Sequence, residues 1–167
     1  MSTEEINSEV ERHQRITHIS LDERSVVRQK PEVEHERAVA IFDLMEENVF
    51  ALTDHPEHGP FHLHLRLEDG RLTFDVRHED GQSLSEIILP LAPFRAVMRD
   101  YFLICESYFE AIRRSTPAQV EAIDVGRRSL HNEGSLQLQE RLKGRIEVDH
   151  NTARRLFTLL YVLQLRG

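Results

Sequence analysis

The chain has 167 residues, enough for one domain with a sizeable core, and its 40% hydrophobic and 30% charged residues are ordinary for a globular protein. A formal net charge of −8 argues against nucleic acid, whose phosphates need clustered lysine and arginine, and against anionic membranes. One cysteine excludes an internal disulfide, and the lack of a signal peptide or of a spanning stretch of about 20 apolar residues predicts a cytoplasmic protein.

The N-terminal third predicts a tail, a strand and a helix. Residues 1–13 are polar and acidic, and they are predicted to be a disordered tail before one globular domain, residues 14–167. From Arg15 to Leu21 apolar and polar residues alternate as they do in a strand. Pro31 suits the first turn of a helix, because its missing N–H would have no partner there. The predicted buried stripe of this helix is Ala38, Ile41, Phe42, Met45 and Val49.

The clearest local pattern in the sequence is a β-hairpin centred on Asp69-Gly70. Apolar residues alternate on both sides of this pair, and Asp-Gly favours a two-residue type I′ turn. A second turn at Asp80-Gly81 adds a third strand, so the region predicts an antiparallel meander with one covered face and one wet face. The predicted cross-strand pairs are Leu67 with Leu72, Leu65 with Phe74, Leu63 with Val76, Glu68 with Arg71, His64 with Asp75, Ile87 with Phe74, and Leu89 with Leu72.

The C-terminal half is predicted to be mainly helical. Residues 93–114 carry apolar side chains at helical spacing, and Cys105 within that face is interpreted as a small buried apolar residue. Residues 145–148 predict a short strand, after which Asp149 caps a last apolar helix. Because strands cluster before helices, we predict an α+β fold. Its antiparallel sheet consists of the N-terminal strand plus the three-strand meander and is covered on one face by about four helices.

The segment between these helices, residues 116–143, is long for one helix. A capping box begins at Thr116, and Gly144 is the matching stop. One helix over this range would be about 40 Å long, whereas a chain of this size should have a radius of gyration of about 15 Å. We therefore predict a bend or a break at Gly126 or Gly134.

The stretch 124–135 holds polar residues that helix packing leaves unexplained. Arg127 and His131 are four residues apart at the edge of a packed stripe, where they need partners, and Glu106 and Glu110 are candidates for that role. The functional interpretation is a small polar pocket that holds an anionic ligand or moves a proton. The structural alternative is an arginine–carboxylate clamp at a helix break. The candidate ligand-binding residues are Arg127, Arg128, His131, Asn132, Glu133 and Glu106, and the sequence identifies no catalytic residue.

A second group of ionisable side chains is rich in histidine. Imidazole and carboxylate ligands suit zinc or nickel. The spacing matches no metal signature and part of the group falls on the wet strand face, so neither a metal nor another cofactor is predicted. The histidines could instead make this surface sensitive to pH near about 6.5. The group consists of His55, His58, His62 and His64, with Asp54 and Glu57 nearby.

Several longer peptides carry a resemblance to a known family. They are PEVEHERAVAI at 31–41, DYF at 100–102, CESYFEAI at 105–112, GRR at 126–128, LHNEG at 130–134, IEVD at 146–149 and TARRLF at 152–157. The chain thereby resembles an uncharacterised protein family of small cytosolic alpha-proteobacterial proteins with no assigned activity. The resemblance covers nearly the whole chain after about Arg15 and implies a bacterial cytosolic protein. It supplies no catalytic residue, substrate or cofactor.

Two functional hypotheses follow from these patterns. The first is a non-enzymatic binding or regulatory module that engages another protein or a second copy of the chain, with Ile88 and Leu84 near the charged outer face of the sheet. It is favoured by the absence of a phosphate loop, a dinucleotide fingerprint or a nucleophile elbow. The alternative is a small-ligand binder or enzyme that uses the polar pocket, whose residues must then converge on an open concavity. The pocket residues of this alternative are Arg127, His131, Asn132 and Glu133.

Overall fold

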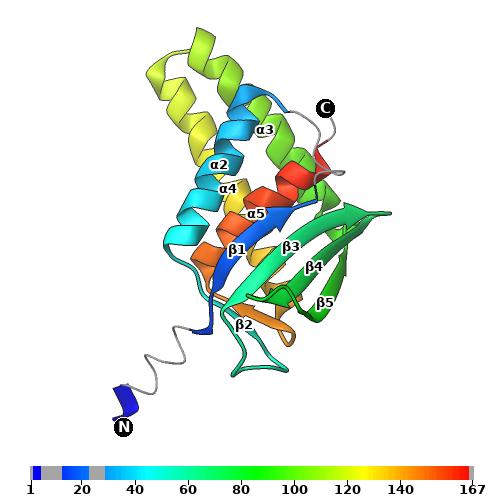
Figure 1. The fold of residues 1–167 in the computed structure, drawn as a ribbon. Coiled ribbons are helices and arrows are strands. Elements are labelled where there is room, and N and C mark those ends of the chain that lie inside the picture. Colours follow the sequence, from blue (N-terminus) through cyan, green and yellow to red (C-terminus); the bar gives the residue numbers. More distant parts are fainter. Residues whose placement is uncertain (1, 5–12, 23–28, 166–167) are drawn as a thin grey trace.

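The computed structural model describes residues 2–4, 13–22 and 29–165, and it has the α+β architecture expected from the sequence (Figure 1). Most of the predicted tail, residues 1–13, lies outside the described residues, so its disorder stays a prediction. The main sheet has four strands in the order β1-β3-β4-β5, and its helices gather on one side (Figure 1). These strands are β1 (Ile16–Leu21), β3 (Phe61–Glu68), β4 (Arg71–His78) and β5 (Ser83–Pro90).

The meander β3-β4-β5 has the predicted register, apart from a shift at Val76 and Arg77 where β4 pairs with β5 near the second turn. Asp69 and Gly70 have φ angles of 53° and 72°, the positive values that a type I′ turn requires at both central positions. Every cross-strand pair expected from the alternation is present, which confirms that turn chemistry and side-chain alternation together fix the register. The covered face is fully apolar, with Leu65, Leu72 and Phe74 all 0% exposed.

The prediction of a purely antiparallel sheet is wrong at β1. This strand runs parallel to β3, so the four-stranded sheet is mixed. Parallel neighbours need a long connection that returns the chain to its starting edge, and here a helix and a short strand fill that connection. The strand alternation in residues 16–21 is compatible with either direction, so the sequence pattern alone could not decide between them.

Two short strands form a separate antiparallel pair, β2 (Phe50–Leu52) with β6 (Ile146–Val148). Asn48 connects this region to β1. Its Nδ2 donates to the carbonyl oxygens of Leu44 at 2.8 Å and Ile16 at 2.9 Å, and its Oδ1 accepts from the Ile16 N–H at 2.7 Å. One amide side chain thus holds together the end of a helix and the start of the first strand.

The helix α2 (Pro31–Glu46) forms as predicted, but its predicted buried stripe is wrong. Phe42 is 64% exposed, and the buried residues are Ala40 and Leu44. α2 packs along α5 and against β1 at the border of the helical layer, so only a narrow row of side chains is covered. A helix at such a border does not bury all of its apolar residues.

A helical hairpin follows the sheet. A short 3₁₀ turn, η1 (Ala92–Phe94), leads into α3 (Arg95–Arg114), and α4 (Pro117–Leu142) runs back beside it. The predicted capping box at the start of α4 is present, with Thr116 Oγ1 accepting from the Gln119 N–H and the Gln119 side chain accepting from the Thr116 N–H. The tip of this hairpin projects beyond the sheet (Figure 1).

The predicted bend or break in α4 is wrong, because Pro117–Leu142 is one helix of 26 residues. One helix of this length is possible because only its second half lies within the body of the protein, while its first half extends outward with α3. Gly134 serves a different purpose. A Cβ built there would lie 2.3 Å from Cζ of Phe157, so glycine permits α4 to approach the last helix closely.

That last helix, α5 (His150–Gln164), is the centre of the helical layer. Asp149 caps it as predicted, with Oδ1 accepting from the Thr152 N–H at 2.9 Å. Its predicted inward residues are all buried, namely Ala153, Leu156, Phe157, Leu160 and Leu163. Within the described ranges, no helix is long and apolar enough to cross a membrane.

Candidate functional site

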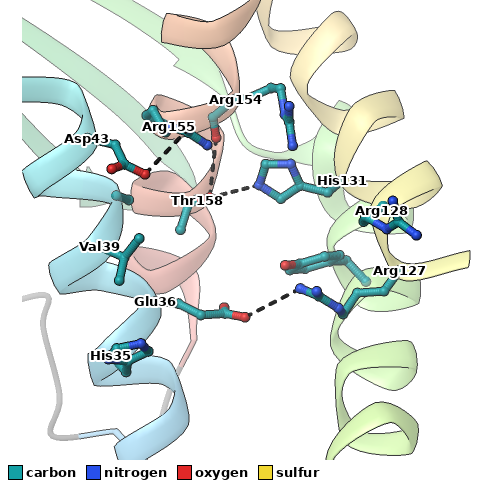
Figure 2. Close-up of a pocket in the computed structure, with 12 residues that line it drawn as sticks. His35, Glu36, Val39, Asp43, Arg127, Arg128, His131, Arg154, Arg155 and Thr158 are labelled. Atoms are coloured by element: carbon teal, nitrogen blue, oxygen red, sulfur yellow. Dashed lines mark hydrogen bonds and ion pairs between the residues drawn. The ribbon is translucent and has the colours of Figure 1, made fainter. Parts of the chain in front are cut away.

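A pocket of about 390 Å³ lies between α2, α4 and α5 (Figure 2). Each of these helices contributes side chains spaced three or four residues apart, which places them on one face of that helix. Four arginines and two carboxylates line the pocket, so it is locally cationic although the chain carries a net charge of −8. The lining residues are His35, Glu36, Val39, Ala40 and Asp43 from α2, Tyr101 from α3, Arg127, Arg128 and His131 from α4, and Arg154, Arg155 and Thr158 from α5.

Arg127 is held mainly by a neighbour on its own helix. Its Nε and Nη2 donate to Oδ1 of Asp124 at 3.1 and 2.7 Å, and its guanidinium carbon lies 4.6 Å from the ring centroid of Tyr108. The remaining nitrogen, Nη1, is 3.8 Å from Oε1 of Glu36 across the pocket (Figure 2). Of the two candidate partners expected from the sequence, Glu106 pairs instead with Lys30 at 3.3 Å and Glu110 with Arg114 at 3.1 Å.

His131 lies deeper in the pocket wall as a neutral group. Its Nε2 is 2.7 Å from Oγ1 of Thr158, whose hydroxyl donates to the carbonyl oxygen of Arg154 at 3.2 Å. A hydroxyl has one proton, so with that proton on the carbonyl, Nε2 of His131 is the donor and Nδ1 is free to accept. Burial, together with the positive charges of Arg154 and Arg127, lowers the pKa of His131 to about 4. The imidazole therefore contributes hydrogen bonding but no charge at neutral pH.

Glu36 is a partly buried carboxylate, with 23% of its side chain exposed. Burial raises its pKa, and Arg127 and His35 oppose that rise. Among the described residues no group donates a hydrogen bond to this carboxylate, and its ion-pair contact is the 3.8 Å approach of Arg127. Its acceptor capacity is therefore largely unused.

Arg154 is the corresponding unused donor. Its Nε is buried and has no hydrogen-bond partner, and no carboxylate in the described part of the chain pairs with it. The adjacent Arg155 differs, because its Nη2 lies 3.5 Å from Oδ2 of Asp43. Burial of an unpaired guanidinium nitrogen is costly, so this arginine has no evident role in stability.

The structure brings together part of the predicted site. Arg127, Arg128 and His131 line the pocket, whereas Asn132, Glu133 and Glu106 do not. The side chain of Asn132 points elsewhere, with Oδ1 2.7 Å from Nε2 of His150, and Glu133 is exposed. The ligand-binding alternative requires Arg127, His131, Asn132 and Glu133 to converge on a concavity, and only Arg127 and His131 do so; Arg128 is the third of the six candidates that lines the pocket.

Sequence reasoning missed the residues that α2 and α5 supply. Two signals could have indicated them. Arg154 and Arg155 interrupt an otherwise apolar helix, and Glu36 and Asp43 are seven residues apart, which places them on one face of α2 two turns from each other. Neither signal, however, states that these two helices face α4.

The histidines of the second predicted group do not meet at one point. His58 stacks with His55 and with His78, each at a centroid distance of 5.1 Å. His62 packs on His18 at 5.0 Å, while Nδ1 of His64 lies 2.7 Å from Oγ of Ser20. In the described residues, no group of three or more His, Cys, Asp or Glu side chains has an arrangement that could hold a metal ion.

Cys105 is buried as predicted, at 5% exposure. Burial, with a smaller contribution from the charge of Glu36, raises the pKa of its thiol to about 12. The thiol is therefore protonated at neutral pH and is not a nucleophile.

Comparison with known proteins identifies the family. A family model described as "Uncharacterised protein family (UPF0262)" matches residues 13–166. A UPF0262 protein of Rhodospirillum rubrum is 60% identical over 149 residues, which cover 89% of this chain and 91% of that protein. A UPF0262 protein of Paramagnetospirillum magneticum is 58% identical, with coverages of 92% and 98%, and one of Nitrobacter winogradskyi is 52% identical, with coverages of 100% and 99%.

No solved structure matches the chain significantly, so no fold relative adds to these findings. The relatives come from alpha-proteobacteria, as the resemblance in the sequence implied. Their printed names give a family and no activity. The length of the family match and the high identities show that this chain belongs to the uncharacterised protein family UPF0262.

Proposed function

We propose that this chain is a binding protein for a small anionic molecule, which it holds in the pocket between α2, α4 and α5. The proposal corresponds to the small-ligand alternative of the sequence analysis. It is supported by a volume of about 390 Å³, which suits a small molecule, and by a lining with more arginines than carboxylates. Arginine is well suited to such a role, because its planar guanidinium binds carboxylate and phosphate through paired hydrogen bonds.

The observation that carries the proposal is the unpaired guanidinium of Arg154. Arg154 lines the pocket and no carboxylate of the described residues neutralises its charge, so an anionic ligand would supply the missing counter-charge. The other three arginines of the pocket already have carboxylate partners, which leaves Arg154 as the primary anchor.

Several features of the lining favour binding over catalysis. Nε2 of His131 is engaged with Thr158, and its lowered pKa makes it a weak base. The thiol of Cys105 is protonated and is not among the lining residues. The described lining thus lacks a nucleophile held by a free base, which group-transfer enzymes commonly need.

The first hypothesis, a module that engages another protein, stays a prediction. On the outer face of the sheet Ile88 is 43% exposed, whereas Leu84 is half-buried and packs against the core. The neighbouring Arg66 is already paired with Glu86 at 3.0 Å. One exposed isoleucine beside satisfied charges is ordinary for a protein surface and indicates no particular partner.

Thermal unfolding with added anions tests the proposed function. Inorganic phosphate or hexanoate, added at constant ionic strength, should raise the unfolding midpoint of the wild-type chain. A ligand at 100 times its Kd adds about 2.7 kcal/mol, or roughly 5–10 °C for a chain of this length. Arg154→Gln should lose the shift. Arg114→Gln removes the same charge from an exposed arginine that pairs with Glu110, and it should keep the shift.

Two results would overturn the proposal. One is that the unfolding midpoint of the wild-type chain does not shift with phosphate, hexanoate, 6-aminohexanoate or adipate, even at millimolar concentration. The other is a shift of equal size in Arg154→Gln, which would mean that anions act on the protein surface and not in the pocket.

A further inference from the structure

The pocket has two ends of opposite character. Arg154, Arg155 and Asp43 lie at one end, and Glu36 and Arg127 lie at the other (Figure 2). Glu36 and Asp43 are seven residues apart on α2, so the ends are separated by up to about 10 Å along that helix. On α5, Arg154 precedes Thr158, the partner of His131, by one turn. A ligand that reaches from one end to the other must therefore be elongated.

We propose that the ligand is amphoteric, with an anionic group bound at Arg154 and an ammonium group bound at Glu36. This inference rests on the proposed function, because it adds a second recognition element to the same pocket. The chemical class is that of zwitterions whose two charges stand several bonds apart, such as ω-amino acids or short peptides with free termini.

Glu36 is suited to bind an ammonium group because its carboxylate has unused hydrogen-bonding capacity and only a distant positive charge. Arg127 gives its two hydrogen bonds to Asp124, at 3.1 and 2.7 Å, and approaches Glu36 only at 3.8 Å. The carboxylate therefore lies in a partly desolvated site with a distant cation and no hydrogen-bond donor from the described residues. An ammonium group supplies three hydrogen-bond donors and a positive charge, so it provides both the donor and the nearby cation that this carboxylate lacks.

Arg154 is suited to bind the anionic group because its positive charge has no carboxylate partner among the described residues. Its guanidinium has no carboxylate partner in the described chain, while Arg155 beside it shares its charge with Asp43 at 3.5 Å. An anion bound at this end would meet two guanidinium groups. That of Arg154 has no carboxylate partner among those residues, and that of Arg155 is partly neutralised by Asp43. Asp43 opposes a highly charged anion at this end, so a single carboxylate fits better than a polyanion.

An apolar wall joins the two ends. Val39 is 41% exposed, Ala40 is buried beside it, and both line the pocket with the ring of Tyr101. Methylene groups between the charged ends of a ligand would cover this wall, which favours an aliphatic linker over a polar one.

Isothermal titration with three molecules of equal chain length tests the inference. They are 6-aminohexanoate, a zwitterion; hexanoate, which lacks the ammonium group; and adipate, which carries a second carboxylate in its place. The wild-type chain should bind 6-aminohexanoate roughly tenfold more tightly than hexanoate, because a hydrogen-bonded charge pair is worth about a factor of ten in affinity. Adipate should bind least tightly, because its second carboxylate meets Glu36.

Glu36→Gln removes the acceptor charge at nearly constant volume and should bring the affinities for 6-aminohexanoate and hexanoate within about threefold of each other. Glu106→Gln is the matched control. Glu106 is an exposed glutamate that pairs with Lys30 outside the pocket, and its variant should keep the wild-type preference. The preference within the wild-type chain is decisive even if the Glu36 variant fails to fold.

The outcomes separate the two proposals. If phosphate or hexanoate binds through Arg154 but 6-aminohexanoate binds no more tightly than hexanoate, the amphoteric ligand is excluded and the anion site stands. A preference that survives in a folded Glu36→Gln variant also overturns this inference. If phosphate and all three molecules of the series fail to bind, both proposals fail together.

Discussion

Gly134 is a residue at which α4 approaches α5 closely, and its replacement by alanine is a direct test of the fold. The added Cβ would lie 2.3, 2.5 and 2.8 Å from Cζ, Cε2 and Cε1 of Phe157. Phe157 is 0% exposed and is surrounded by the core, so its ring has no free space to enter. Gly134→Ala must therefore push the two helices apart or displace the ring.

The expected loss follows from two opposing effects. Overpacking a core by a methyl group costs about 1–3 kcal/mol, and three ring atoms under 3 Å place this case near about 3. Alanine returns about 1 kcal/mol, because glycine is the poorer residue in a helix interior. The net loss is about 2 kcal/mol. With an m value of about 2 kcal/mol/M, the urea midpoint should fall by about 1 M.

Gly126→Ala is the matched control on the same helix. Its Cβ would lie 2.8 Å from Cδ1 of Ile104, the far end of a flexible, half-buried side chain that can turn away. The helix-propensity gain should then dominate, so this variant should be as stable as the wild type or more stable by up to about 1 kcal/mol.

Urea titration followed by circular dichroism measures both variants. The reasoning is refuted if Gly134→Ala unfolds at the wild-type urea concentration or above it. It is equally refuted if Gly126→Ala loses as much stability as Gly134→Ala, because the close approach to Phe157 would then explain nothing.

Two further predictions concern ionisable groups. His131 has a folded-state pKa of about 4, below an unfolded value of about 6.5, so the unfolded chain binds more protons between these values and folding is weakened as pH falls through that window. The unfolding free energy of the wild type minus that of His131→Gln should therefore decrease from about pH 7 to about pH 4, and a difference that stays constant would contradict the assignment. Because the thiol of Cys105 is buried with a pKa of about 12, Ellman's reagent should label it slowly in the native protein and rapidly in denaturing urea. Rapid labelling of the native protein would show that the thiol is accessible.

The hairpin and the direction of β1 show what the sequence could and could not predict. The register of β3 and β4 depends on neighbours: an Asp-Gly turn fixes the pairing, and alternation on both sides agrees with it. The direction of β1 depends on how 39 residues between Leu21 and Phe61 return the chain to the sheet, and strand alternation carries no information about that path. Local patterns therefore determined the meander but not the mixed sheet.

The candidate site likewise contains residues that the sequence could predict and residues that it could not. Arg127 and His131 could be predicted because both lie on one helix at a spacing of four residues. Glu36 and Arg154 could not be joined to them, because they come from helices that only tertiary packing brings opposite α4. The prediction of Glu106 or Glu110 as the partner of Arg127 relied on the preceding helix, whereas the structure gives that role to Asp124, three residues away on the same helix.

The long α3–α4 hairpin has a consequence for local stability. No residue of α4 before Gly134 is buried, whereas Gly134, Ser135, Leu138 and Leu142 anchor its second part in the core. The backbone amides of the first part should thus open to hydrogen exchange at a lower free energy than those after Gly134. Arg127 and His131 lie on this less stable part, while Arg154 lies on the central helix. The pocket is therefore formed in part by a stable helix, α5, and in part by a segment of α4 that unfolds locally more readily. A ligand bound to both would slow hydrogen exchange mainly in residues 117–133.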